Sequence, residues 1–352
     1  MKSFQVGILG ATGAVGQKFV RLLEDHPWFT IRVLGASERS AGKKYEEAAH
    51  WIEPTEMPSD IAPLEVVECT PEQFNGADFV FSGLDSSVAE EIEKNFAEAG
   101  IPVISNAKNY RMHEQVPLLV PEVNPDHAEL ITKQKFNSDG SGWIVTNPNC
   151  VSVPLSMSLK PLEDAFGIES LVVTSMQSTS GAGYPGVASL DILANVVPYI
   201  GGEESKVETE STKVLGSLGE DSITFNNFTI QATAVRVPTI EGHLLSVSVK
   251  LKNPPSSIDK AKQAYTDWNN PIADLKLPSS PANPIRLYTK NRHPQPRLHA
   301  DREGGMQTAV GRLRNGTVMD LGYVTMAHNT IRGAAGGAIL NGELLAAKGY
   351  LS

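Results

Sequence analysis

One cysteine lies where an expected strand gives way to an expected helix. The segment WIVTNPNCVSVPL, residues 143–155, runs from an apolar stretch through a polar turn to Cys150 and a second apolar stretch. Such a cysteine is either a small buried apolar residue or a nucleophile, because a helix N-terminus lowers the pKa of a thiol. On the second interpretation, we expect the Cys150 thiol to be partly ionised near neutral pH. The other cysteine, Cys69, lies among acidic residues and is expected to be a structural thiol.

A glycine-rich loop indicates the cofactor. GATGAVG, residues 10–16, follows an expected strand at residues 4–9 and precedes a segment with helical apolar spacing. Glycines permit a tight turn and a close approach of the backbone to a phosphate, and the helix N-terminus supplies N–H groups. The alternative is a glycine-rich turn without a ligand. A dinucleotide site joined to a cysteine indicates aldehyde oxidation or its reverse, in which the acyl group is carried as a thioester.

The second expected strand is FTIRVLGAS, residues 29–37. The residues at its end indicate which dinucleotide binds. GASERSAGKK, residues 35–44, contains Ser37, Arg39 and Ser40, which favour a 2′-phosphate. Glu38 favours the ribose of NAD instead. Because cations and hydroxyls outnumber the carboxylate, we expect NADP. SGLDSS, residues 82–87, follows a later strand at the edge where such sheets bind ligands.

Thiol chemistry of this kind also needs an acid–base group, and the chain has eight histidines. His243 is the best placed, since it directly precedes a strongly alternating strand; His328 is equally interpretable as a packing or capping residue. Arg236 lies among apolar neighbours and needs a carboxylate partner, from either a substrate or the protein. Glu203 and Lys206 share one expected helical face, where a solvated ion pair is the common alternative.

Alternating strands and helices must position these residues. Up to Trp143, the alternation predicts a parallel sheet with right-handed crossovers. After Cys150 the pattern changes to long strands at residues 170–180 and 244–251, the second alternating as a half-buried antiparallel strand does. The proline-rich segment 281–305 is expected to be a loop. A length of 352 residues indicates two domains, and the chain ends in an expected helix rich in small residues.

Composition excludes several classes of partner. The formal net charge of −10 argues against nucleic acid, so an anionic ligand must be met by local cations or N–H groups. There is no run of about 20 apolar residues, so no membrane span is expected, and the N-terminus does not resemble a signal peptide. Two separate cysteines predict neither a disulfide framework nor a metal site. A reducing, cytoplasmic setting fits best.

Taken together, these segments resemble the aspartate-β-semialdehyde dehydrogenase family, in the branch found in archaea and fungi. The resemblance runs end to end through GILGATGAVGQ, SNAKNYRM, LLVPEVNP, NPNC, QSTSGAGYPG, GGEESK, RVPTIEGH and HNTIRGAAGG. It implies reversible, NADPH-dependent conversion of 4-phospho-L-aspartate to L-aspartate 4-semialdehyde and phosphate through a cysteine thioester. This reaction serves the biosynthesis of lysine, methionine, threonine and isoleucine.

The resemblance also implies the architecture and the assembly. An NADP-binding Rossmann-type domain would comprise residues 1–149 and 329–352. An inserted α+β domain of largely antiparallel sheet, residues 150–328, would carry catalysis and dimerisation. The chain would form a dimer, often within a tetramer.

Individual residues acquire roles from the same resemblance. Cys150 would be the nucleophile, His243 the acid–base group, and Gln177 a residue that positions the intermediate. Substrate binding would use Glu203 and Arg236 for the amino and carboxylate groups, and Arg111, Lys206 and Asn149 for the phosphate. Cofactor binding would use Gly10, Thr12, Gly13, Ala14, Val15, Ser37, Arg39, Ser40, Ser82, Gly83, Leu84, Asp85, Ser180, Gly181 and Asn329.

Three other activities are consistent with parts of this pattern. An acyl-CoA reductase such as malonyl-CoA reductase shares the cysteine chemistry but binds no amino group, so Glu203 with Lys206, and Asn149 beside Cys150, disfavour it. N-acetyl-glutamyl-phosphate reductase has related chemistry, but GGEESK and QSTSGAGYPG fit it poorly. A non-catalytic NADP-binding redox sensor is disfavoured because every candidate polar group is retained.

Overall fold

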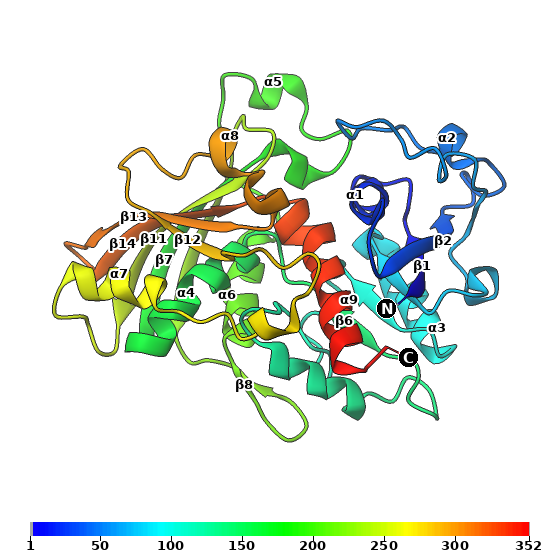
Figure 1. Ribbon diagram of the computed structural model, residues 1–352. Helices are drawn as coiled ribbons and strands as arrows, with labels where there is room; N and C mark the ends of the chain where they lie inside the picture. The colour runs from blue at the N-terminus through cyan, green and yellow to red at the C-terminus, as the bar shows by residue number, and fades with distance from the viewer. Residues whose placement is uncertain (1–2, 352) are drawn as a thin grey trace.

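The computed structural model describes residues 3–351, and its first sheet is entirely parallel. The strand order is β3-β2-β1-β4-β5-β6, which confirms the expected Rossmann-type sheet on the right of Figure 1. Its strands are β1 (Phe4–Leu9), β2 (Phe29–Ala36), β3 (Val66–Glu68), β4 (Phe79–Ser82), β5 (Val103–Ser105) and β6 (Ile144–Thr146). The accompanying helices are α1 (Ala14–Leu23), α2 (Tyr45–Ala48), α3 (Ser86–Glu98) and the C-terminal α9 (Gly336–Lys348), with 3-10 turns η1 (Pro71–Phe74) and η2 (Pro125–Lys133).

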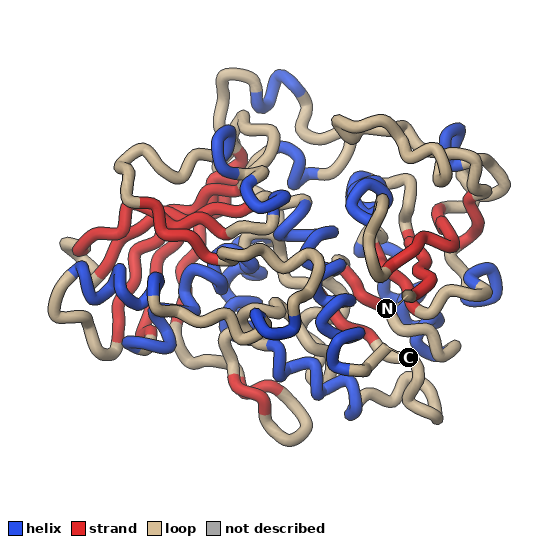
Figure 2. The backbone as a smooth tube through the Cα atoms, viewed as in Figure 1, coloured by secondary structure: helices blue, strands red, loops and turns tan. Residues whose placement is uncertain are grey.

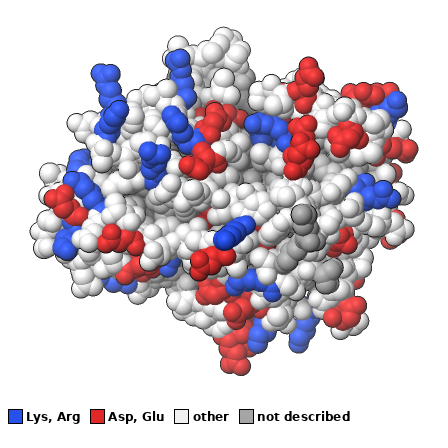
Figure 3. Space-filling view, viewed as in Figure 1, with Lys and Arg blue, Asp and Glu red and all other residues white. Residues whose placement is uncertain are grey.

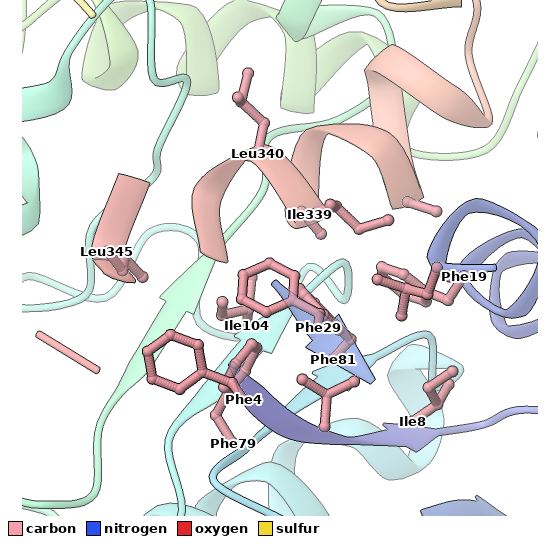
Figure 4. Close-up of a cluster of buried hydrophobic side chains, with 14 of the residues drawn as sticks. Phe4, Ile8, Phe19, Phe29, Phe79, Phe81, Ile104, Ile339, Leu340 and Leu345 are labelled. Carbon is pink, nitrogen blue, oxygen red and sulfur yellow. The ribbon is translucent and has the colours of Figure 1, made fainter. Parts of the chain in front are cut away.

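The core of this sheet brings together the two ends of the chain. Figure 4 shows aromatic residues from β1, β2 and β4 in one cluster with apolar side chains of α9. The rings of Phe29 and Phe79 meet edge to face, with centroids 5.3 Å apart. Gly342 of α9 lies where an added Cβ would approach Phe81 to 3.2 Å, so the small residues of this helix permit close packing on the sheet.

The second sheet is mixed, with the order β10-β7-β11-β14-β13-β12. Its three inner pairings are antiparallel and its two outer pairings are parallel. The strands, red on the left of Figure 2, are β7 (Ile168–Gln177), β10 (Thr229–Arg236), β11 (His243–Leu251), β12 (Ile285–Tyr288), β13 (Thr308–Asn315) and β14 (Leu321–Ala327). A small hairpin of β8 (Ser217–Leu218) and β9 (Ile223–Thr224) stands apart from it.

Strand β12 corrects the expectation of a loop over residues 281–305. This segment contributes an edge strand, followed by the short helix α8 (Pro296–His299) and the turn η5 (Arg302–Gly305). Ile285 and Leu287, two residues apart, pack on the core, while the strand pairs with β13. The alternation in this short stretch was obscured by the prolines around it.

Three longer helices cover one face of the second sheet, and much of the other face is left uncovered. The covering helices are α4 (Ser152–Phe166), α6 (Glu203–Val214) and α7 (Ile258–Thr266). In β11 every second residue is buried beneath them, as the alternating sequence predicted, and β7 alternates in the same way from Leu171 onward. Of the remaining elements, α5 (Ser189–Ile192), η3 (Thr179–Ala182), η4 (Ala273–Leu275) and the π-turn η6 (Ile331–Ala335) connect the larger ones.

The surface and the helix lengths complete the description. On the face in Figure 3, acidic and basic side chains are interspersed over both parts of the molecule. Within residues 3–351, no helix combines the length and the apolar character needed to cross a membrane.

Candidate active site

The structure brings Cys150 and His243 together. Cys150 lies in the turn between β6 and α4, and His243 is the first residue of β11. The Sγ of Cys150 is 3.2 Å from Nε2 of His243, although 93 residues separate them. The imidazole is fully buried, whereas the cysteine is half-buried. This geometry fits a nucleophile and its acid–base partner.

The surroundings of Cys150 correct the expectation of a partly ionised thiol. Burial, followed by the negative charge of Glu203, raises the pKa of Cys150 to about 12. Three cations oppose this shift without cancelling it: Arg111, Arg236 and Lys206. Helix α4 begins only at Ser152, so its N-terminus is not directly beneath the sulfur. Loss of hydration outweighs these charges, so the shift opposes ionisation of the resting thiol.

Burial acts on His243 in the opposite sense. It lowers the pKa of His243 to about 3, with further lowering by Arg236 and His328. At neutral pH the imidazole is therefore uncharged and able to act as a base. His328 does not join the reaction centre, since its Nδ1 accepts a hydrogen bond from the N–H of Ile331, as a capping histidine does.

The buried His243 should make stability depend on pH. Its folded-state pKa lies below the usual value of 6.5, so folding favours the neutral form. The stability gained is present above pH 6.5 and is lost as the pH falls towards about 3. The free energy of unfolding can be measured with urea between pH 6.5 and 5. For wild type it should fall by up to about 1.4 kcal/mol per pH unit more than for His243→Asn. Parallel curves for the two proteins would contradict the burial cost.

Glu203 gathers polar side chains from three segments. Its Oε1 accepts hydrogen bonds from Nδ2 of Asn149 at 2.7 Å and from Nε2 of Gln177 at 3.4 Å. Its Oε2 accepts from Nζ of Lys206 at 3.0 Å. Glu203 is only 5% exposed, so this is not the solvated ion pair that was the alternative interpretation. The structure thus places Glu203, Lys206, Asn149 and Gln177 around Cys150.

Sequence analysis missed Glu210, which lies on the same face of α6. One oxygen of Glu210 accepts from Nη1 of Arg111 at 2.9 Å, and the other accepts from the backbone N–H of Asn149. Farther along, Nζ of Lys213 donates to the carbonyls of Arg111, His113 and Val116. The signal was present as a spacing of three, four and three residues in Glu203, Lys206, Glu210 and Lys213. Helix α6 thereby holds Arg111 close to the cysteine turn.

Arg236 is held at the site without a protein carboxylate. Its Nη1 donates to the carbonyl of Ser178 at 2.7 Å, and the residue is 7% exposed. Within residues 3–351 it makes no ion pair with an acidic side chain, so that alternative is not realised in the described chain. Gly181 lies directly over it and His243, because a Cβ there would be 3.0 Å from Nη1 of Arg236 and 2.9 Å from the imidazole. The remaining donors of the guanidinium suit an anionic group of a substrate.

The glycine loop forms a cradle for phosphate. Gly10 has a φ of +74°, and an added Cβ would be 3.0 Å from the carbonyl oxygen of Gly83. Thr12 and Gly13 lead into α1, whose N-cap carries no side-chain hydrogen bond. The N–H groups of its first turn, at Ala14 and Val15, can therefore meet a phosphate. These features fit a dinucleotide.

The groups expected to read the 2′-phosphate lie beyond β2. Ser37 and Arg39 line a cavity of about 570 Å³ together with Leu84, and Ser40 follows them. Arg39 is exposed and makes no ion pair within residues 3–351. This set fits NADP because a guanidinium and two hydroxyls are available for an additional phosphate.

Other expected cofactor contacts are partly engaged within the protein. Ser82 is fully buried and its hydroxyl donates to Glu93 at 2.6 Å, so its side chain does not face the cavity. Asp85 caps α3 by accepting from the N–H of Ser87.

The second cysteine, Cys69, has the surroundings of a structural thiol. Burial raises the pKa of Cys69, and its sulfur lies 3.7 Å from the carbonyl of Ala36.

A second cavity lies beside the start of α1. Ala14, Ser180 and Thr330 line a cavity of about 400 Å³. Asn329 was expected to contact the cofactor. It is 1% exposed, and its side-chain amide forms hydrogen bonds with neighbouring residues. Its Nδ2 donates to Oγ of Ser180 at 2.8 Å, and its Oδ1 accepts from the N–H of Gly242 at 2.9 Å. Asn329 also contacts Ser178, which in turn contacts Nδ1 of His243.

Comparison with known proteins gives a consistent result. Residues 5–131 match the family described as semialdehyde dehydrogenase, NAD binding domain, and residues 159–332 match its dimerisation domain. The chain is 48% identical to an aspartate-semialdehyde dehydrogenase of Archaeoglobus fulgidus, over 97% of this chain and 98% of the relative. It is 45% identical to that of Schizosaccharomyces pombe, over 99% of each.

Solved structures resemble the whole molecule. The crystal structure of aspartate semialdehyde dehydrogenase with NADP from Candida albicans has a TM-score of 0.92 and 42% identity, covering 99% of this chain and 100% of that one. That of aspartate semialdehyde dehydrogenase II complexed with ASA from Vibrio cholerae has a TM-score of 0.77 and 26% identity, covering 98% and 99%. With the site geometry, these likenesses show that the chain belongs to the aspartate-semialdehyde dehydrogenase family.

Proposed function

We propose that this chain interconverts 4-phospho-L-aspartate and L-aspartate 4-semialdehyde plus phosphate, using NADP(H) and a thioester on Cys150. The activity belongs to the biosynthesis of the aspartate family of amino acids, as in its relatives. The observation that carries the proposal is the 3.2 Å contact between Cys150 and His243 beside Arg236, a cation without an ion pair among residues 3–351.

The first half-reaction follows from the protonation of the pair. Nε2 of His243 takes the proton of the Cys150 thiol, and the sulfur attacks the acyl carbon of the acyl phosphate. The C–O bond to phosphate breaks, phosphate leaves, and a thioester on Cys150 remains. Arg111 and Lys206 lie where they can meet the phosphate, which would account for these cations near Cys150 in a chain whose formal net charge is −10.

The second half-reaction releases the aldehyde. When bound, NADPH supplies the hydride that reduces the thioester carbon. His243 gives its proton to the oxygen of that carbon as charge develops there, which would give a hemithioacetal. When His243 takes that proton back, the C=O bond forms as the C–S bond breaks, and the aldehyde is released. The sulfur then recovers the proton from His243.

Arg236 and Glu203 supply the selectivity for an amino acid. The guanidinium of Arg236 would hold the substrate carboxylate, while the buried carboxylate of Glu203 would hold the ammonium group. Gln177, which contacts Glu203, would position the intermediate. An acyl-CoA substrate such as malonyl-CoA has no ammonium group for Glu203 to bind.

Arg236→Lys should lower kcat/KM for the semialdehyde by about 10- to 100-fold. A lysine ammonium cannot bind Ser178 and a carboxylate with the same planar geometry, and such a paired contact is worth about 1–3 kcal/mol. Steady-state kinetics would show the loss chiefly in the KM for the semialdehyde, with the KM for NADP as internal control. Unchanged kinetics would assign Arg236 a purely structural role.

NADP should be preferred to NAD because of Arg39. Arg39→Ala is expected to lower kcat/KM with NADP about tenfold, which corresponds to one charge-assisted hydrogen bond, and to leave kcat/KM with NAD unchanged. The two cofactors thus serve as controls for each other. Equal losses with both would mean that Arg39 does not contact the 2′-phosphate.

A reverse-direction assay tests the function itself. The purified chain should reduce NADP in the presence of aspartate semialdehyde, and only when inorganic phosphate is added. Replacement of phosphate by coenzyme A should give no reduction. Reduction that requires coenzyme A would establish the acyl-CoA reductase alternative, and NADP binding without turnover would favour the redox sensor.

We also propose a division into two domains, an oligomeric state and a cellular location. The packing of α9 on the first sheet supports a cofactor domain of residues 1–149 and 329–352 around an inserted domain of 150–328. The part of the second sheet that helices leave uncovered and the match to a dimerisation domain support a dimer or a tetramer. Light scattering on the purified protein should give at least the dimer mass, and a monomer would contradict this. Two free thiols are consistent with a cytoplasmic location.

A further inference from the structure

The two oxygens of Glu210 hold two different parts of the site. Oε1 accepts a hydrogen bond from Nη1 of Arg111 at 2.9 Å, and Oε2 accepts one from the backbone N–H of Asn149, the residue before Cys150. Glu210 is 2% exposed, so solvent does not compete for either contact. One buried carboxylate on α6 therefore joins a cation to the turn that carries the nucleophile.

The guanidinium of Arg111 is fixed by the protein but keeps N–H groups for a ligand. Its Nη2 donates to the carbonyl of Asn106 at 2.7 Å, and Nζ of Lys213 donates to its backbone carbonyl at 2.8 Å. Its Nε is buried and has no hydrogen-bond partner within residues 3–351. Burial raises the pKa of Cys150, and Arg111 lies near enough to the sulfur to oppose that shift. Such a guanidinium suits an oxyanion bound beside the sulfur.

We propose that Glu210 is a positioning residue for phosphate, because it holds Arg111 at a fixed place relative to Cys150. Phosphate bound to Arg111 then lies beside the acyl carbon on the sulfur. This inference rests on the proposed function. The hydrogen bonds of Glu210 reach neither the sulfur nor Arg236 and Glu203, which are assigned to the two ends of the amino acid. Its effect should therefore be confined to the step in which phosphate enters or leaves.

The negative charge of Glu210 and its hydrogen bonds have opposite consequences for phosphate. A carboxylate beside a site for an anion repels that anion through space. If only this charge mattered, its removal would strengthen phosphate binding. If Glu210 instead holds Arg111 in place, the same removal should weaken phosphate binding. The direction of the change in the KM for phosphate thus separates the two effects.

Glu210→Gln removes the charge and keeps the size of the side chain. A carboxamide accepts at its oxygen but donates at its nitrogen, so it cannot accept from Arg111 and from the N–H of Asn149 at the same time. The N–H of Asn149 belongs to a buried turn, whereas Arg111 presents a side chain that can rotate. We therefore expect the contact with Arg111 to be the one that is lost.

In the reverse-direction assay, Glu210→Gln should raise the KM for inorganic phosphate about tenfold, which corresponds to one charge-assisted hydrogen bond. The KM values for aspartate semialdehyde and NADP should change less than about twofold, because Glu203, Arg236 and the glycine loop keep their contacts. A residue with only a structural role would disturb the site as a whole and would not separate these values. Each KM is measured with the other two substrates at saturation.

Glu208→Gln is the matched control, since it makes the same change on the same helix. Oε1 of Glu208 accepts from the N–H of Ala232 in β10 at 3.0 Å rather than from Arg111. All three KM values should stay within about twofold of wild type. A second comparison uses Arg111→Gln as the background. If Glu210 acts through Arg111, the addition of Glu210→Gln should raise the KM for phosphate no further.

An unchanged or lower KM for phosphate in Glu210→Gln overturns the proposal, as does an equal rise in the KM for the semialdehyde. A further rise in the Arg111→Gln background also overturns it. Should Glu210→Gln not fold, Glu210→Asp decides. Its carboxylate keeps the charge but is one methylene shorter and cannot reach both partners, so the KM for phosphate should rise, and an unchanged value overturns the proposal. Wild type without phosphate-dependent turnover would refute the proposed function, and this inference with it.

Discussion

Cys150→Ser is expected to lose roughly 10⁴-fold or more of the turnover while retaining NADP binding. A serine hydroxyl is a far weaker nucleophile than a thiolate, and the enclosed site does not favour ionisation of either group. An oxygen ester, if formed, would also be less readily reduced than a thioester. Turnover is measured in the phosphate-dependent reverse assay, and binding by fluorescence titration with NADPH.

Cys69→Ser is the matched control for this experiment. Cys69 packs in the first domain, with its sulfur near the carbonyl of Ala36, and makes no contact with the catalytic pair. The same change of sulfur to oxygen should therefore preserve turnover at that position. Near-native activity of Cys150→Ser would remove Cys150 from the mechanism, and a loss of NADP binding would show that the substitution damaged the fold.

His243→Asn is expected to lower kcat by about 10²- to 10⁴-fold, the usual contribution of a general acid–base group. Asparagine can donate a hydrogen bond to the sulfur but cannot take its proton. Because burial raises the pKa of Cys150 to about 12, the thiol of this variant should ionise only in strongly alkaline solution. Wild type should react over a broad neutral range, where both Cys150 and His243 are uncharged and exchange a proton directly.

The measurement is the pH profile of kcat for wild type and variant. Activity of His243→Asn should rise about tenfold per pH unit into the alkaline range, in parallel with the thiolate fraction. His328→Asn provides the comparison at a second buried histidine, one that caps η6 and lies outside the reaction centre. A flat profile for His243→Asn, or an equal loss in His328→Asn, would contradict the role assigned to His243.

Local patterns were sufficient for much of the fold. Strands with apolar runs, the glycine loop before α1 and the alternation in β11 are properties of neighbouring residues, and they appear where the sequence predicted them. Strand β12 was missed because only four residues pair there, between prolines that indicate a loop. Short edge strands depend on their partner more than on their own sequence.

In the candidate site, too, some residues could be identified from the sequence alone and others only from their contacts. The chemistry that Cys150, His243 and Arg236 can perform follows from their residue types, so the sequence identified them and the order of motifs related them to a family. Glu210 and Ser178 were missed because a serine or a glutamate is ordinary in itself. Their importance arises from contacts with Asn149, 61 residues away, and with His243, 65 residues away.

The class of fold, the cofactor loop and the candidate nucleophile could be predicted from the sequence, because each depends on side-chain chemistry and on short-range periodicity. The direction in which the two pKa values shift could not be predicted without the three-dimensional structure. A helix N-terminus predicts an ionised Cys150, but burial and the charge of Glu203 raise the pKa of its thiol, and burial lowers the pKa of His243. Desolvation is a property of the assembled surroundings, which no single segment of the chain contains.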